Sequence, residues 1–208
     1  MSSWYELSED VLIFQMKAKA DLARMIKNKV PEVIDAVATE VELAIQHISK
    51  DVDALVGQII PLLDQQIVED IPQEFVVPVC YDLGIDWEEV QKQTGLVRSE
   101  IEQLHQSVYY EVSYGFTPGF LYLAGLPDNL HCSRKAVPRT QVPKGAVGIG
   151  GQKTGIYSLP TPGGWQIIGQ TPMTLFDPDA HIPTPIPDGS KLKFKAISKK
   201  EFEEYGGA

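Results

Sequence analysis

The alternation of apolar and polar residues in the first part of the chain changes period three times. Residues 4–16 form two short strand-like runs around a polar Ser-Glu-Asp turn. Residues 20–29 carry apolar side chains at helical spacing, and residues 32–48 return to the alternation typical of two strands. Residues 51–63 then repeat apolar positions three and four apart, which indicates an amphipathic helix. These patterns predict a small α+β domain over residues 1–72.

A second pattern begins at residue 73. FVVPVCY and YYEVSY are short strand-like runs, and SKLKFKAI alternates apolar residues with lysines. Two helices are predicted between the first two runs, one capped by Asp86 and one by Ser99, with acidic residues in each first turn. The tail from residue 201 is expected to be frayed or bound to the surface. Many short strands with only two short helices predict a closed or sandwich-like β architecture for residues 73–200.

Residues 115–172 have an unusual composition. They hold 11 of the 17 glycines and 7 of the 15 prolines, yet they also contain the aromatic residues that disordered segments lack. Their charged residues are five cations and the single acid Asp128, a local net charge of +4, while the rest of the chain carries −14. The five cations are Arg134, Lys135, Arg139, Lys144 and Lys153. A rigid, basic, glycine-rich region in an acidic protein predicts an anion-binding site, with solvated loop lysines and structural turns as the alternative.

Composition narrows the class of protein. The chain of 208 residues is long enough for one large domain or two small ones. Its net charge of −10 argues against duplex nucleic acid or an anionic membrane as the main partner. No apolar run approaches the roughly 20 residues of a membrane span, and the N-terminus does not resemble a signal peptide. Cys80 and Cys132 are the only cysteines, so we expect a protein of the reducing cytoplasm.

Several motifs of self-sufficient enzymes are missing. The run GIGGQKTG resembles a phosphate loop, but Val147 and Gln152 occupy positions where the Walker motif needs glycine. The dinucleotide fingerprint fails because Lys153 stands in place of its third glycine. Neither C-x-x-C nor H-E-x-x-H occurs, so no metal site is predicted.

The order of motifs along the chain resembles the KipI family, whose members are called the B subunit of 5-oxoprolinase or allophanate hydrolase subunit 1. The resemblance rests on PVCY, LHQSVY, GFTPGFLYLAGL, PRTQVPKGAVGIGGQKTGIY, TPGGWQIIGQTP and LFDP, between about residues 78 and 178. It implies a small α+β, ferredoxin-like domain over residues 1–72. A cyclophilin-like β-barrel over residues 73–208 would follow, of the type found in carboxyltransferase subdomains C and D.

The resemblance also implies an activity. In the family, the B subunit works with a homologous C subunit and with an A subunit to open 5-oxo-L-proline to L-glutamate at the expense of ATP. We expect ATP, with Mg²⁺, to be shared with these partners, and the lactam oxygen to be phosphorylated before water attacks. Such chemistry needs cations and N–H groups where phosphate charge develops. The expected catalytic residues are His105, Arg139 and Lys153. The expected binding residues are Gly150, Gly151, Gln152, Thr154, Tyr157, Gly163, Gly164 and Thr171.

Each assignment has a structural alternative. His105 would serve as a proton carrier near neutral pH, or it would cap a helix end. Arg139 would grip an anion, or it would brace a loop, and Gly150 would approach a ligand or form a barrel bulge. Trp165 is more simply a core residue. Two other functions stay open: inhibition of a sensor histidine kinase, and a role within a urea-type or allophanate-type carboxyltransferase or hydrolase.

Overall fold

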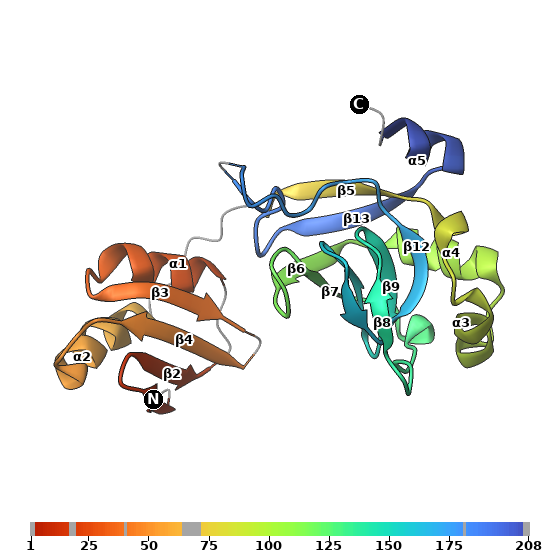
Figure 1. Ribbon diagram of the computed structural model, residues 1–208. Coiled ribbons are helices and arrows are strands. Elements are labelled where there is room, and N and C mark those ends of the chain that lie inside the picture. The colour runs from red at the N-terminus through yellow and green to blue at the C-terminus, as the bar shows by residue number, and fades with distance from the viewer. Residues whose placement is uncertain (1–2, 17–19, 40, 64–71, 181, 206–208) are drawn as a thin grey trace. The chain divides into compact units, whose positions relative to one another are not determined.

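The computed structural model describes residues 3–16, 20–39, 41–63, 72–180 and 182–205. The chain divides into two compact units, Met1–Ile71 and Pro72–Ala208 (Figure 1). This division falls one residue before the boundary that the change of pattern predicts. Each unit has its own hydrophobic core.

The first unit is an antiparallel sheet with two helices. Its strands lie in the order β1-β2-β4-β3. Its elements are β1 (Ser3–Ser8), β2 (Val11–Gln15), α1 (Ala20–Lys29), β3 (Val33–Ala38), β4 (Glu42–His47) and α2 (Val52–Leu63). The elements follow one another as ββαββα, whereas a ferredoxin-like fold follows βαββαβ. The mixed α+β character is as predicted, but the ferredoxin-like topology is not confirmed.

Alternation along the strands places the core of the first unit. Leu12 and Phe14 of β2 are fully buried, as are Leu43 and Ile45 of β4, and the four residues belong to one cluster. Residues two apart share a face of a strand, so these side chains point to one side of the sheet. The apolar stripes of α1 and α2 complete the same cluster.

The second unit is built on a seven-stranded sheet in the order β12-β9-β10-β7-β6-β13-β5. All of its pairs are antiparallel except β13 with β5, and β8 and β11 form a separate two-stranded ribbon. Its strands are β5 (Glu74–Val79), β6 (Tyr110–Tyr114), β7 (Leu121–Ala124), β8 (Arg139–Val142), β9 (Ala146–Gly150), β10 (Lys153–Ile156), β11 (Thr161–Gly163), β12 (Gln166–Gln170) and β13 (Lys191–Ala196). Its helices are α3 (Trp87–Thr94), α4 (Arg98–Ser107) and α5 (Lys199–Tyr205), with short 3₁₀ turns η1 (Tyr81–Leu83) and η2 (Asp128–Leu130).

This sheet curls into a half-barrel (Figure 1). Its two end strands, β12 and β5, meet through one bridge, in which Cys80 and Gln170 exchange backbone hydrogen bonds of 2.8 and 3.1 Å. The predicted closed barrel is therefore joined at one end only. Pro78 lies two residues before Cys80 on the same edge of β5, where its missing N–H interrupts no ladder bond with β13.

The sheet of the second unit has a core on each face. One cluster contains Val147 and Ile149 of β9, together with residues of α3 and α4. The other contains Phe120, Tyr157 and Trp165, together with Val142 of the ribbon strand β8.

One predicted helix start and the predicted tail need correction. Asp86 lies at the N-cap of α3, as predicted, although its side chain makes no cap bond. Helix α4 begins at Arg98 rather than after Ser99, and the Glu100 carboxylate accepts the Val97 N–H at 3.0 Å. Residues 201–205 of the tail belong to α5, which begins with a reciprocal capping box in which the Ser198 and Glu201 side chains each accept the other's N–H, at 3.3 and 2.7 Å. Residues 206–208 lie outside the described ranges. No helix within the described ranges is long and apolar enough to cross a membrane.

Candidate functional site

The glycines of β9 and β10 form a seat for the indole ring of Trp165. A Cβ on Gly150 would lie 2.6 Å from indole Cδ2, and a Cβ on Gly155 would lie 2.8 Å from Cζ3. Gly148, on the same face of β9, would meet the Trp165 Cβ at 3.2 Å. Real Cβ atoms essentially never come within 3.0 Å of other atoms, so glycine is needed for packing at Gly150 and Gly155, and a side chain at Gly148 would be tight. The sequence G-I-G-G-Q-K-T-G therefore encodes a tryptophan seat, and the predicted phosphate-binding role of the Gly150 backbone gains no geometric support.

An aromatic cluster surrounds this ring. Phe120 packs edge-to-face on Trp165 with centroids 5.6 Å apart, and Tyr122 lies at 5.7 Å. The Arg134 guanidinium lies over the indole, 5.5 Å from its centroid. Trp165 itself is only 5% exposed, whereas Arg134 is exposed. The Arg134 guanidinium therefore contributes both a cation–π contact and a positive charge at the protein surface.

A buried carboxylate organises the cations beside the ring. Arg139, at the start of β8, pairs with Asp86 Oδ1, and Lys135 Nζ lies 3.3 Å from the same oxygen. The other oxygen, Oδ2, accepts the Ile167 N–H at 2.7 Å. The Asp86 side chain is 5% exposed and that of Arg139 is 23% exposed, so this ion pair is largely screened from water. Arg139 thus braces the start of α3 against β12. This arrangement favours the structural alternative for Arg139 over direct binding of an anion.

The positive charge at this place is not fully neutralised. Among the described residues, Arg134, Lys135 and Arg139 have one carboxylate partner between them, Asp86. Three cations against one carboxylate leave a formal excess of about two charges, as an anion-binding surface requires. We call Arg134, Lys135, Arg139, Asp86 and Trp165 the Trp165 site.

Three further predicted residues join the Trp165 site. The Gly164 carbonyl accepts the Lys135 N–H at 2.7 Å. A Cβ on Gly163 would lie 2.3 Å from the Tyr157 hydroxyl oxygen, so the absence of a side chain lets the tyrosine reach this strand. Burial raises the pKa of Tyr157, and the charges of Arg134 and Arg139 oppose that shift.

His105 and Thr154 lie in the core on the other face of the sheet. The Thr154 hydroxyl donates to the Gly148 carbonyl at 2.9 Å, so it accepts from His105 Nε2–H, also at 2.9 Å. His105 Nδ1 is then free of hydrogen and accepts the Tyr81 hydroxyl at 2.7 Å. The ring is 0% exposed and stacks on Phe194 with centroids 4.4 Å apart.

These contacts favour the structural alternative for His105. Burial lowers its pKa from the ordinary 6.5 to about 3, so the imidazole is neutral at pH 7. The enclosed ring gives no support to the predicted proton transfer near neutral pH. His105 instead ties α4 to β10 through a fully satisfied chain of hydrogen bonds.

The remaining predicted residues lie elsewhere in the second unit. Gly151, with φ +68°, exchanges backbone hydrogen bonds with Cys132 at 2.7 and 3.2 Å and turns the chain between β9 and β10. Gln152 is exposed in this turn, and Lys153 pairs with Gly150 across the hairpin. Thr171 lies beside Gly145, whose carbonyl accepts its N–H at 2.8 Å.

Sequence reasoning misses the central role of Asp86. It lies 53 positions from Arg139, and its place before a predicted helix suggests a cap, the role that aspartate most often plays there. A single sequence carries no signal that pairs two such distant residues.

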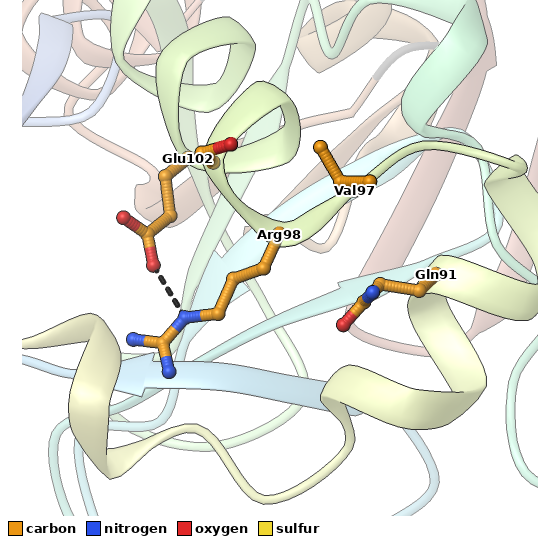
Figure 2. Close-up of a pocket in the computed structure, with 5 residues that line it drawn as sticks. Gln91, Val97, Arg98 and Glu102 are labelled. Atoms are coloured by element: carbon orange, nitrogen blue, oxygen red, sulfur yellow. Dashed lines mark hydrogen bonds and ion pairs between the residues drawn. The ribbon is translucent and has the colours of Figure 1, made fainter.

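A surface depression between α3 and α4 is the other notable feature of this unit. It is lined by Gln91, Val97, Arg98, Ser99 and Glu102. Figure 2 shows the Arg98 side chain directed at Glu102, with which it makes an ion pair of 2.6 Å. Arg98 also pairs with Asp82 at 2.7 Å, so its charge is matched by two carboxylates. This depression therefore lacks the excess positive charge of the Trp165 site.

The described residues fit a phosphorylated cofactor only in part. The cations of the Trp165 site suit phosphate oxygens. In the described ranges, however, no three His, Cys, Asp or Glu side chains gather as ligands for a metal ion. Among the residues that the structure describes, the cations are of a kind that suits phosphate, and no group of side chains is assembled for Mg²⁺.

Comparison with known proteins places the chain in context. A model of the carboxyltransferase domain, subdomain C and D, matches residues 5–186. The chain is 37% identical to the 5-oxoprolinase B subunit of Bacillus subtilis (strain 168) over 174 residues, 82% of this chain and 66% of the relative. It is 46% identical to the 5-oxoprolinase B subunit of Escherichia coli O157:H7 over 128 residues, 60% of this chain and 58% of the relative. The chain therefore spans about three fifths to two thirds of these relatives.

A solved structure shows the same fold. The protein TTHA0988 superposes with a TM-score of 0.78 and 30% sequence identity. The match covers 95% of this chain and only 40% of that one. In TTHA0988 the shared fold is thus one part of a longer polypeptide.

Proposed function

The chain belongs to the family of the carboxyltransferase domain, subdomain C and D, and from this premise we propose that it is the B subunit of an ATP-dependent 5-oxoprolinase. The proposed reaction opens 5-oxo-L-proline to L-glutamate in a complex with a homologous C subunit and an A subunit. The observation that carries the proposal is the similarity to two relatives named as the B subunit of 5-oxoprolinase, at 37 and 46% identity.

The charge distribution of the second unit supports this function. Opening a lactam at neutral pH is difficult because its nitrogen is a poor leaving group. ATP, when bound to the complex, would supply the phosphoryl group that activates the lactam carbon toward water. Arg134 is the cation of the Trp165 site best placed to stabilise negative charge, because Arg139 and Lys135 are both paired with the buried Asp86.

The proposed roles differ in kind. Arg134 would contact an anion directly, since its guanidinium is exposed above Trp165. Arg139 and Asp86 are positioning residues that hold β8, β12 and the start of α3 in register. His105 supports β10 from within the core, and we assign it no proton transfer. The general acid for the ring nitrogen and the Mg²⁺ ligands would come from the partner proteins.

The names of the relatives support the need for partners, because a B subunit implies other subunits. The A and C subunits would supply the groups that complete the site. The names of the relatives give no support to a histidine-kinase inhibitor or to a urea-type carboxyltransferase.

An omission experiment tests the proposal. The purified chain, the A subunit and the C subunit are mixed with 5-oxo-L-proline, ATP and Mg²⁺, and L-glutamate is measured. We expect glutamate only when all three proteins are present. A control with Lys200→Glu, an exposed change on α5, should keep full activity, whereas Arg134→Glu should lose most of it. Equal glutamate formation with and without this chain would contradict the proposal.

A further inference from the structure

The short segment that carries Arg134 is held by hydrogen bonds on both sides of that residue. Cys132, two positions earlier, exchanges backbone bonds with Gly151 at 3.2 and 2.7 Å. Lys135, the next residue, donates its N–H to the Gly164 carbonyl at 2.7 Å. A backbone fixed on both sides limits the positions that the exposed Arg134 side chain can reach.

Two glutamine side chains bind the backbone of Ser133, which directly precedes Arg134. The Ser133 N–H donates to Gln93 Oε1 at 2.7 Å, and Gln166 Nε2 donates to the Ser133 carbonyl at 3.0 Å. Gln93 belongs to α3 and Gln166 to β12, so these bonds tie the segment to two different elements. The two roles differ, because Gln93 serves here as an acceptor and Gln166 as a donor.

The presence of Gln166 in the core is not explained by stability. The residue is 2% exposed, and no group among the described residues donates to its buried Oε1. A buried polar atom without a partner lowers the stability of a fold. Ser133 is exposed, so water can hydrate its carbonyl if the bond from Gln166 is lost. The hydrogen bond to Ser133 is therefore the feature that an apolar residue at this position would not provide.

We propose that Gln166 and Gln93 are positioning residues that fix Arg134 for its contact with the anion of the proposed reaction. This inference rests on the proposed function, and it adds the residues that order the charged group before the anion binds. Trp165 lies under the Arg134 guanidinium, and Gln166, the next residue, holds the backbone beside Arg134. A charged donor that is already ordered stabilises developing negative charge without a further loss of entropy.

Three variants and a control separate the donor from the acceptor. Gln166→Met keeps the approximate volume and removes both the donor and the unpartnered Oε1, so the melting temperature should change by less than about 3 °C. Gln93→Glu keeps an oxygen that accepts the Ser133 N–H, whereas Gln93→Met removes it. The matched control is Gln170→Met on the same strand as Gln166, since Gln170 Nε2 donates to the carbonyl of Lys144 in another loop, at 2.7 Å.

The first measurement is the NMR signal of the Arg134 Nε–H in each purified full-length chain, assigned as the signal that is absent from Arg134→Lys. The indole ring of Trp165 shifts this signal, so its position reports whether the guanidinium stays over the ring. We expect the signal to move in Gln166→Met and in Gln93→Met, and to keep its position in Gln93→Glu and in the control. An unchanged signal in both methionine variants would overturn the inference and leave the proposed function standing.

The second measurement is the kcat of glutamate formation with the A and C subunits. We expect Gln166→Met to lower kcat at least about tenfold, but less than about twofold when it is added to Arg134→Ala, because the glutamine acts through the arginine. Gln170→Met should keep the full kcat. Equal loss in the two backgrounds, or a fall in the melting temperature of Gln166→Met far beyond 3 °C, would refute a positioning role. No glutamate from the unsubstituted chain would overturn both the proposed function and this inference.

Discussion

Substitution of Gly150 by alanine tests the explanation of the glycine-rich motif. The new methyl group would lie 2.6, 2.7 and 2.8 Å from indole atoms Cδ2, Cε2 and Cγ of Trp165. Carbon atoms prefer separations of about 3.5 Å or more, so the ring must move by roughly 1 Å. Phe120 and Tyr122 pack against that ring and resist the movement.

The expected loss of stability follows from overpacking. Extra methyl groups in a well-packed core cost about 1–3 kcal/mol in the free energy of unfolding. Gly150→Ala should lie near the upper end, because the obstacle is an aromatic ring enclosed by other side chains. Gly151→Ala is the matched control: its Cβ would meet nothing within 4 Å, but φ is +68°, so backbone strain alone should cost about 1 kcal/mol.

Urea unfolding followed by tryptophan fluorescence measures both losses. Trp4 is replaced by phenylalanine in every variant, so that the signal reports the second unit only. Each glycine substitution is repeated in a Trp165→Leu background. The cost of Gly150→Ala should largely disappear there, giving a coupling energy of about 1–2 kcal/mol, while the cost of Gly151→Ala should stay the same.

Additivity of Gly150→Ala with Trp165→Leu would refute the tryptophan seat. A stable Gly150→Ala protein that had lost turnover in the complex would instead support the expectation from the sequence that this backbone approaches a ligand.

Three other outcomes follow from the structure. The pKa of His105 is lowered to about 3 in the folded state, so unfolded chains bind more protons than folded chains between about pH 3 and 6.5. The free energy of unfolding should therefore fall as pH decreases through that range, by up to about 1.4 kcal/mol per pH unit. His105→Gln should flatten this dependence in acid titrations monitored by circular dichroism. Arg139→Ala removes the main partner of the Asp86 carboxylate, which is 5% exposed, and should lower the free energy of unfolding in urea by about 2–3 kcal/mol. The added change Asp86→Asn should restore part of that stability. Full stability of the single variant would show that Arg139 does not brace the fold. Ser198→Ala should speed amide exchange in α5, since loss of the cap costs about 1 kcal/mol, and leave exchange in β13 unchanged.

Elements with a clear period could be predicted from the sequence. The alternation of β13, with Leu192 and Phe194 buried between lysines, is as predicted, and so are the stripes of α1 and α2. The order of the strands in each sheet was less accessible, because the same short patterns suit several topologies. The helix α5 was missed although Ser198 and Glu201 have the spacing of a capping box, since the acidic tail suggested fraying.

The candidate site was predicted in part. Arg139, Tyr157, Gly150, Gly163 and Gly164 do come together, around Trp165. The roles of these residues were not predictable, because a glycine in a sequence indicates that another group comes close but does not identify that group. Charge was likewise predicted only in part. Composition showed that cations are in excess over residues 115–172, but only the fold shows that Asp86, far away in the sequence, pairs with both Lys135 and Arg139.

The most direct test of the proposed function is to add this chain last to a mixture of the A subunit, the C subunit, 5-oxo-L-proline, ATP and Mg²⁺. The measurement records ADP and L-glutamate in the same sample. We expect both products to appear only after the addition, at about one glutamate for each ADP, and the Arg134→Glu chain to give far less of each. ADP formation that does not depend on 5-oxo-L-proline, or glutamate formation before the chain is added, would contradict its assignment as the B subunit of a 5-oxoprolinase.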